Sequence, residues 1–330
     1  MQEKYAKKQV SVATKLLVLL FVGLSGICLC YMNIDQRNSI RKSRRFLPSD
    51  NRENVVTCQL QTDHSIPTHY PQPTSYNRKE CSCTPVHNFV ILSMQRSGSG
   101  WFETLLNSHP NISSHGEVFL DEKKRKNFAS IKKVLDAIYN LEWKSSASKK
   151  ECTAAVGFKW MLNQGAMEYN KEALAYFKQK NVSIIFLFRH NLLRRYVSIL
   201  ANVYDKEAKL LNGTHQSHVH SSVEAQILAT FKPVVNVTLL PLYLRRVEEL
   251  CHDAIVSFRS TRHKTVSYED LVKNSLHVLE IQKFLGVIPK KLTSHHVKIH
   301  TEPLSKQIQN WKEVYHRLKG TEFDEFLHDY

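Results

Sequence analysis

The stretch from Asn88 to His109 constrains the fold more than any other part of the chain. It opens with a short apolar run, residues 89–93, which predicts a buried β-strand because it is rich in β-branched and aromatic residues. A turn of glycine and serine follows at residues 95–100, and the apolar residues after it recur at helical spacing. The sequence therefore predicts a strand, a glycine-rich turn and a helix in direct succession.

A turn of this kind is suited to bind an anion. Gly98 and Gly100 allow the backbone to approach a ligand closely, and the first turn of the helix offers N–H groups that lack intrahelical partners. Arg96 adds a guanidinium group, whose planar set of donors matches phosphate or sulfate oxygens. The turn has no Gly-Lys pair, which argues against the Walker A motif and a nucleoside triphosphate with Mg²⁺. An ordinary strand–turn–helix with a basic residue at its edge is the alternative.

Residues 96–101 resemble the 5′-phosphosulfate loop of P-loop sulfotransferases, which commonly reads K-S-G-T-T-W. The residues that would hold the phosphosulfate are Arg96, Ser97, Gly98, Ser99, Gly100 and Trp101. Arg96 replaces the lysine of the family pattern, and Gly100 stands where many members carry threonine. The sequence of residues 93–113 is most similar to the plant membrane-bound branch related to nodulation-factor, or carbohydrate, sulfotransferases. The resemblance extends to the C-terminus and implies a P-loop-type α/β fold that uses 3′-phosphoadenosine 5′-phosphosulfate (PAPS) without a metal.

The same resemblance suggests a second phosphate site. Arg189 at the end of a predicted strand and Ser198 in the following helix are similar to the family's 3′-phosphate site. Their spacing is nine residues here, where many cytosolic members have eight. Near the C-terminus, residues 298–311 resemble the region that closes over the cofactor.

Sulfuryl transfer needs a base for the acceptor hydroxyl and positive charge for the leaving phosphate. Glu117 resembles the glutamate base of carbohydrate-type and bacterial relatives, and a carboxylate stabilised by a helix dipole is its alternative. His115 is the other candidate base, because an imidazole titrates near neutrality. Lys159 resembles the family's strand-borne lysine near the leaving oxygen, and a solvent-exposed strand-edge lysine is its alternative. Arg96 would share the electrostatic task of Lys159.

Further apolar patterns predict the rest of an α/β domain. We expect strands over 156–161, 182–188 and 264–268, and helices over 127–141, 171–180, 192–209, 241–255 and 269–285. Alternating strands and helices are typical of a parallel sheet covered on both faces, and ligands of such sheets bind beyond the carboxyl ends of the strands. Arg96, Glu117, Lys159 and Arg189 are therefore expected at one edge. A histidine cluster at residues 215–220 indicates a solvated loop, with metal binding as the less favoured alternative.

The beginning of the chain predicts a membrane anchor. Residues 16–32 are apolar and uncharged, at the lower length limit for a membrane-spanning helix. No small-residue cleavage site follows them, which favours an uncleaved signal-anchor over a cleaved signal peptide. Polar residues with several prolines follow and predict a stem. The expected organisation is a cytosolic tail (1–15), a transmembrane signal-anchor (16–32), a stem (33–86) and a sulfotransferase domain (87–330).

Positive charges flank the predicted span almost equally and do not set its orientation. All four N-x-[ST] sequons lie after it, at Asn111, Asn181, Asn212 and Asn236, as do five of the seven cysteines. These features favour a single-pass type II glycoprotein of the Golgi membrane with a lumenal catalytic domain. Asn111 and Asn181 are expected in surface turns. Because five cysteines are an odd number, at least one would stay free or pair with another chain.

The chain carries a formal net charge of +16 over its 330 residues, which is compatible with anionic nucleotides, acidic glycans or nucleic acid. The motifs favour a sulfotransferase acting on a hydroxyl of a carbohydrate or glycoconjugate, with no nucleic acid partner. A catalytically silent glycan- or nucleotide-binding protein on the same scaffold is the alternative. A glycosyltransferase shares the stem-and-anchor layout, but its metal-dependent versions need an Asp-x-Asp pair that this sequence lacks.

Overall fold

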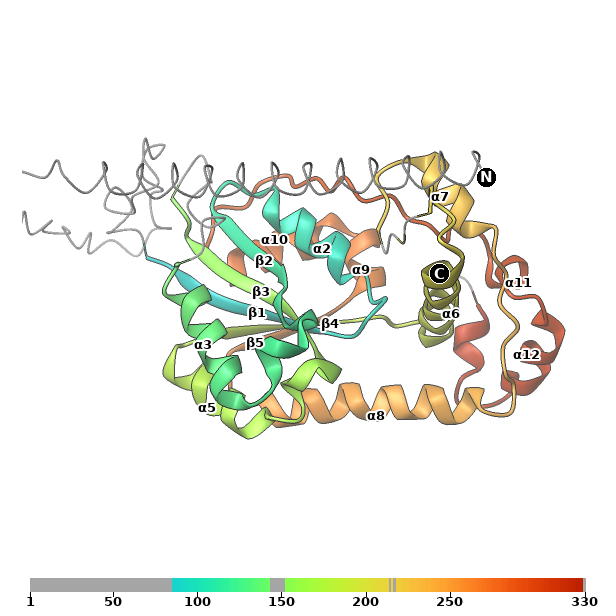
Figure 1. The fold of residues 1–330 in the computed structure, drawn as a ribbon, viewed down its shortest axis with the longest axis horizontal. Coiled ribbons are helices and arrows are strands. Elements are labelled where there is room, and N and C mark those ends of the chain that lie inside the picture. Colours follow the sequence, from blue (N-terminus) through green and yellow to red (C-terminus); the bar gives the residue numbers. More distant parts are fainter. Residues whose placement is uncertain (1–84, 143–151, 214, 216–217, 329–330) are drawn as a thin grey trace, which may run out of the picture. The chain divides into compact units, whose positions relative to one another are not determined.

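A parallel β-sheet forms the centre of the structure, with the strand order β2-β3-β1-β4-β5 (Figure 1). The computed structural model describes residues 85–142, 152–213, 215 and 218–328. The strands are β1 (His87–Ser93), β2 (Ile112–Glu117), β3 (Ala155–Met161), β4 (Ser183–Phe188) and β5 (His263–Ser267). Every neighbouring pair in the sheet is parallel. All carboxyl ends therefore meet at one edge, which confirms the predicted α/β class.

Helices cover both faces of this sheet. In Figure 1, α2 (Ser99–Asn107), α9 (Tyr268–Lys273) and α10 (Ser275–Phe284) lie on one side, and α3 (Phe128–Tyr139), α5 (Asn170–Gln179) and α8 (Leu240–Phe258) lie on the other. The remaining described α-helices are α6 (Leu192–Ala208), α7 (Ser222–Ala229), α11 (Leu304–Gln307) and α12 (Trp311–Leu318).

The apolar run of β1 explains why the sheet is buried on both faces. Its side chains alternate between the two sides of the strand. Val90 and Leu92 join the apolar cluster under α3, α5 and α8, whereas Phe89 and Ile91 join the cluster under α2 and α10. Four consecutive fully buried residues therefore fix the end of β1, and with it the position of the turn that follows.

Most predicted elements are confirmed, and α7, α11 and α12 are helices that were not predicted. Two further differences concern β2 and residues 269–285. The polar segment that becomes β2 was not predicted as a strand, because Ile112 is its only large apolar residue. The single helix expected over 269–285 is two helices, α9 and α10. Asn274 interrupts them in an extended conformation, with φ −136° and ψ 112°, and its side chain accepts the Leu276 N–H to cap α10.

A β-bulge near the end of β2 positions a candidate catalytic residue. The pairing of β2 with β3 shifts between Ser114 and Glu117, so that Glu117 lies opposite Lys159. Gly116 allows this bulge, because its φ of 80° lies in the left-handed region that side chains disfavour.

The structure tests part of the cysteine and sequon predictions. Cys152 is disulfide-bonded, and Cys251 is a free thiol whose pKa is raised to about 12, chiefly by burial. Asn181, Asn212 and Asn236 are exposed. The expectation of a surface turn at Asn111 is wrong, because this residue is fully buried and its Nδ2 donates to the Cys152 carbonyl.

The predicted anchor at 16–32 lies outside the described residues, as does the stem up to residue 84. Among the described residues, no helix combines the length and the apolar character that a membrane crossing requires.

Candidate functional site

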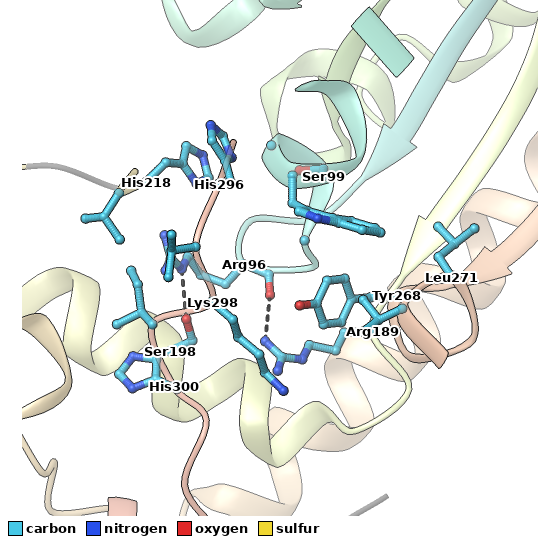
Figure 2. A pocket seen from close by; sticks show the side chains of 17 residues that line it. Arg96, Ser99, Arg189, Ser198, His218, Tyr268, Leu271, His296, Lys298 and His300 are labelled. Carbon is cyan, nitrogen blue, oxygen red and sulfur yellow. Dashed lines mark hydrogen bonds between the residues drawn. The ribbon is translucent and has the colours of Figure 1, made fainter. Parts of the chain in front are cut away.

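A cavity of about 270 Å³ lies at the carboxyl edge of the sheet, beside the first turn of α2 (Figure 2). Seven of the eight residues predicted to bind the nucleotide line it: Arg96, Gly98, Ser99, Gly100, Trp101, Arg189 and Ser198. We call these seven residues the loop wall. The eighth, Ser97, is buried in the same turn, and its Oγ has no hydrogen-bond partner within the described parts of the chain. A buried hydroxyl without a partner is costly, so an anionic ligand at this turn would be favourable.

Two residues of the turn adopt left-handed conformations, Arg96 with φ 66° and Gly98 with φ 77°. A side chain at Gly98 would also collide with the ring of Tyr268, because its Cβ would lie 2.1 Å from Cδ2. The first helical hydrogen bond runs from the Phe102 N–H to the Gly98 carbonyl, at 3.0 Å. The three preceding N–H groups therefore have no intrahelical acceptor and form the positive end of the helix dipole.

Arg96 extends from the turn to the neighbouring helix α6. Its Nε donates to Ser198 Oγ at 2.9 Å (Figure 2). Its Nη1 donates to Asn202 Oδ1 at 3.5 Å. Arg189 Nη1 donates in turn to the Arg96 carbonyl, at 3.3 Å. Burial, together with the nearby Arg189 charge, lowers the pKa of Arg96 to about 10, so this group stays protonated at neutral pH. The structure thus brings the loop and the predicted 3′-phosphate residues into direct contact.

Arg189 is held by the segment that follows β5. Its Nε lies 3.4 Å from Glu269 Oε1, and its guanidinium lies 5.2 Å from the centre of the Tyr268 ring. Trp101 meets the same ring edge-on at 5.7 Å. The sequence predicted only a strand over 264–268 and a helix over 269–285 here, and these contacts were missed. The available signal was the position of Tyr268 and Glu269 directly after a parallel strand, at the edge where ligands bind.

The candidate catalytic residues form a second cluster around Lys159. Lys159 Nζ lies 3.3 Å from Glu103 Oε2 and 3.7 Å from Glu117 Oε2. Gln164 Nε2 donates to the other oxygen of Glu117, at 2.6 Å. Lys159 is only 6% exposed, so the solvent-exposed alternative for this lysine is wrong.

Glu103 is a member of this cluster that sequence reasoning missed. It lies on α2 and is buried, and its Oε1 accepts hydrogen bonds from Ser114 Oγ and from the Gly116 N–H. It therefore connects the loop helix both to Lys159 and to the bulge that places Glu117. A glutamate in an amphipathic helix usually belongs to the solvated face, which is why its sequence position gave no signal.

The structure does not place every predicted catalytic residue at the cavity. Glu117, Lys159 and His115 are absent from its lining, as far as the described residues extend, and His115 lies half-buried in β2. The cluster around Lys159 nevertheless lies near the cavity, because the charge of Lys159 contributes to lowering the pKa of two cavity residues, His218 and His296.

The other side of the cavity is formed by His218, Val219 and residues 296–300, which we call the histidine wall. The Val297 N–H donates to the Val219 carbonyl at 3.0 Å in an antiparallel bridge. His296, Lys298 and His300 alternate along the extended segment and all line the cavity (Figure 2). Burial, and then the charges of Arg96 and Arg189, lower the pKa of His300 to about 4.

The histidine cluster of the sequence is thus divided. His215 pairs with Asp205, with Nδ1 2.7 Å from Oδ2. His218 instead lines the cavity and stacks on His296, with 4.8 Å between ring centres, although part of its surface remains exposed. The prediction of a solvated loop therefore missed the contact of this residue with the site. In the part of the chain that the structure describes, no group of three or more His, Cys, Asp or Glu side chains could hold a metal ion.

The chain shows distant homology to nodulation protein H of Rhizobium meliloti. It is 23% identical to the protein of strain 1021 over 246 residues, which cover 71% of this chain and 92% of that protein. A second nodulation protein H from the same species is 22% identical over 247 residues, with the same coverage. No protein-family model matches the chain.

Among solved structures, the chain is similar to a sulfotransferase domain from the curacin biosynthetic pathway. The sequence identity is 19%, and the match covers 62% of this chain and 75% of that domain. The TM-score of 0.31 is too low to establish a shared fold.

Proposed function

We propose that this protein is a sulfotransferase that moves a sulfuryl group from PAPS to a hydroxyl of a carbohydrate or glycoconjugate. The observation that carries the proposal is the loop wall, where two buried guanidinium groups and the first turn of α2 face one cavity. The distant homology to nodulation protein H supports a sulfotransferase-like activity, in agreement with the resemblance of residues 93–113.

The residues present fit an anionic nucleotide. The N–H groups of Ser99, Gly100 and Trp101 and the buried hydroxyl of Ser97 would hold the phosphosulfate. Arg189 and Ser198 would hold the 3′-phosphate. Arg96 already contacts Ser198, so its guanidinium could serve both ends of the nucleotide.

In the proposed reaction, an acceptor hydroxyl oxygen forms a bond to sulfur while the bond between sulfur and the bridging phosphate oxygen breaks. The electron pair of the broken bond stays on the phosphate, where Arg96 and Lys159 would stabilise its charge. Glu117 would take the hydroxyl proton, and His115 is the alternative base. The products are a sulfate ester and adenosine 3′,5′-bisphosphate, and no oxidant or reductant is needed.

Glu117 is prepared for such a role by its neighbours. Gln164 fixes one carboxylate oxygen, and Lys159 lies near the other. A carboxylate held in one orientation by a donor and a cation can accept a proton from a correctly placed hydroxyl. Glu103 shares Lys159 but is 7% exposed and occupied by two hydrogen bonds, so it would position the lysine and leave the proton transfer to Glu117.

We further propose that the protein is a type II membrane protein whose catalytic domain lies in the Golgi lumen. The apolar run at 16–32 and the three exposed sequons after it, at Asn181, Asn212 and Asn236, support this topology. The disulfide at Cys152 supports an oxidising compartment, because such bonds persist outside the cytosol. Localisation of a C-terminally tagged chain, with glycosidase digestion of the protected domain, would test both points.

A second candidate function is a silent nucleotide- or glycan-binding protein, favoured by the absence of Glu117 from the cavity lining in the described structure. Calorimetry with adenosine 3′,5′-bisphosphate in EDTA should show binding by either protein. Only the enzyme should transfer radioactive sulfate from PAPS to a panel of glycan acceptors, and Glu117→Gln should abolish this transfer without loss of nucleotide binding.

Arg96→Ala should remove nucleotide binding, whereas Arg246→Ala is the matched control, because Arg246 is an exposed side chain of α8. A wild-type chain that binds a UDP-sugar tightly and ignores the bisphosphate would overturn the proposal.

A further inference from the structure

The contact between His218 and the first turn of α2 has no role in the function proposed above. A Cβ built on Gly100 would lie 2.5 Å from both Cε1 and Nε2 of His218. The imidazole therefore occupies the space that a side chain at position 100 would fill, with its Nε2 edge toward the turn. Any larger residue at this position would require the ring to move.

The position of the ring is fixed from two directions. Its face stacks on His296, with an angle of 16° between the planes, and the adjacent Val219 carbonyl accepts the Val297 N–H. The residues just before His296 also contact α2, because Thr104 Oγ1 and Ser294 Oγ share a hydrogen bond. The histidine wall is thus anchored against the helix whose N-terminus faces the cavity.

Neither ring nitrogen of His218 has a hydrogen-bond partner within the described residues. Burial lowers its pKa, and the positive charges of Arg96 and Lys159 act in the same direction, with smaller effects of His296 and His220. The ring is therefore neutral at pH 7, and a neutral imidazole carries one N–H donor and one acceptor nitrogen. Nε2 lies beside Gly100 in the first turn of α2, and both residues line the cavity.

We propose that His218 is a donor-binding residue, whose Nε2–H supplies to the phosphosulfate of PAPS the side-chain contact that Gly100 cannot provide. This inference rests on the proposed function and adds a contact from a distant loop to the turn of residues 96–101. His218 and Gly100 act as a pair, since the small residue at position 100 makes room for the imidazole. In this arrangement the imidazole of His218 takes the part of a side chain at position 100, and it can do so only when the histidine wall is folded against α2.

The test uses three variants of the full chain, with calorimetric titration of adenosine 3′,5′-bisphosphate and of PAPS. His218→Phe keeps a ring in the same space but removes the donor, and should weaken binding by about tenfold to a hundredfold, as for loss of a hydrogen bond to a charged group. His218→Gln keeps a donor and should retain more affinity than His218→Phe. His252→Phe is the matched control, because His252 is an exposed residue of α8.

A second pair of variants tests the spatial exchange. Gly100→Ser alone should weaken binding, because its Cβ collides with the imidazole, and His218→Ala alone should weaken binding by loss of the donor. The double variant should recover affinity to within about threefold of wild type, because the serine hydroxyl at position 100 can then fill the vacated space and bind the ligand. Thermal unfolding of each variant would identify any loss of folded protein.

Two outcomes would separate the inference from the function beneath it. If His218→Phe binds as tightly as wild type while Arg96→Ala does not bind, the ring only fills space and the inference is wrong, but the nucleotide site stands. If the wild-type chain binds neither nucleotide, both proposals fail together.

Discussion

The two walls of the cavity are built in different ways. The loop wall follows directly from strand ends: Arg96 comes three residues after β1, and Arg189 comes one residue after β4. The histidine wall has no strand beneath it in the described structure and depends on the bridge between Val219 and Val297. The first wall is therefore fixed by the packing of the sheet, whereas the second is held by contacts outside the sheet, namely this bridge and the hydrogen bond between Thr104 and Ser294. The proposed binding of an anion would use both walls, but stability should depend mainly on the first.

The largest effect on stability is expected when Lys159, in the cluster beside the loop wall, is replaced. Lys159→Met would leave the carboxylate of buried Glu103 without its ion pair, and Glu117 would lose its partner too. Because an unpaired buried charge is costly, we expect unfolding at neutral pH to become easier by about 3 kcal/mol. Chemical denaturation would measure this, with Lys171→Met, at an exposed position of α5, as the control. An unchanged midpoint would show that the cluster adds nothing to stability.

Low pH should reduce the stability of the folded protein through His300 of the histidine wall. Burial, Arg96, Arg189 and Arg194 hold the pKa of His300 at about 4 in the folded protein, against 6.5 for an ordinary histidine. The unfolded chain then binds the proton more readily, so the stabilisation is complete above pH 6.5 and is lost as the pH falls toward 4. The loss at His300 should be about 3 kcal/mol, and His300→Gln should flatten the profile. Identical profiles for the variant and the wild type would contradict this prediction.

A variant of the bridge should separate the two walls. Val297→Pro removes the N–H that donates to Val219, whereas Val297→Ala keeps it. We expect the proline variant to bind adenosine 3′,5′-bisphosphate about tenfold more weakly, with a change in unfolding free energy of about 1 kcal/mol or less. Calorimetry and thermal unfolding on both variants would decide. A proline variant that binds normally would show that the histidine wall is not needed for binding.

The smallest effect is expected from the exposed cation of the histidine wall. Lys298→Ala should reduce nucleotide affinity by about threefold at low salt and by nothing measurable at about 0.5 M salt, because the interaction of an exposed charge is screened. Lys291→Ala, in the same connection, is the control. If a large loss persists at high salt, Lys298 contacts a phosphate directly.

The same division decides what could be predicted from the sequence. β1, β3 and β4 carry apolar runs, and α2 has helical spacing, so local patterns predicted the strand, turn and helix around residues 96–101. Arg189 and Ser198 of the loop wall were predicted from the family resemblance. β2 could not be predicted, because its polar sequence and its bulge give no alternating pattern.

The residues missed at the site share one property. Glu103 and His218 owe their positions to segments far away in the chain. Nothing next to Glu103 in sequence marks it as functional, and the histidine cluster around His218 indicated only a solvated loop. Local patterns report hydrophobic burial and turn chemistry, whereas these side chains are defined by tertiary contacts alone. Lys159 is an intermediate case, since its place on a strand was predicted but its two carboxylate partners follow only from the fold.

The bridge between Val219 and Val297 also sets an order of assembly. The chain between these residues includes α7, α8, β5, α9 and α10, so the bridge closes a long loop. Contacts that close such a long loop form late, because the entropy of closure must first be overcome. The contact between Arg96 and Ser198 in the loop wall closes a still longer loop, because its partners are 102 residues apart in the chain. A newly made chain would therefore complete both sides of the cavity late in folding, after its local helices and turns.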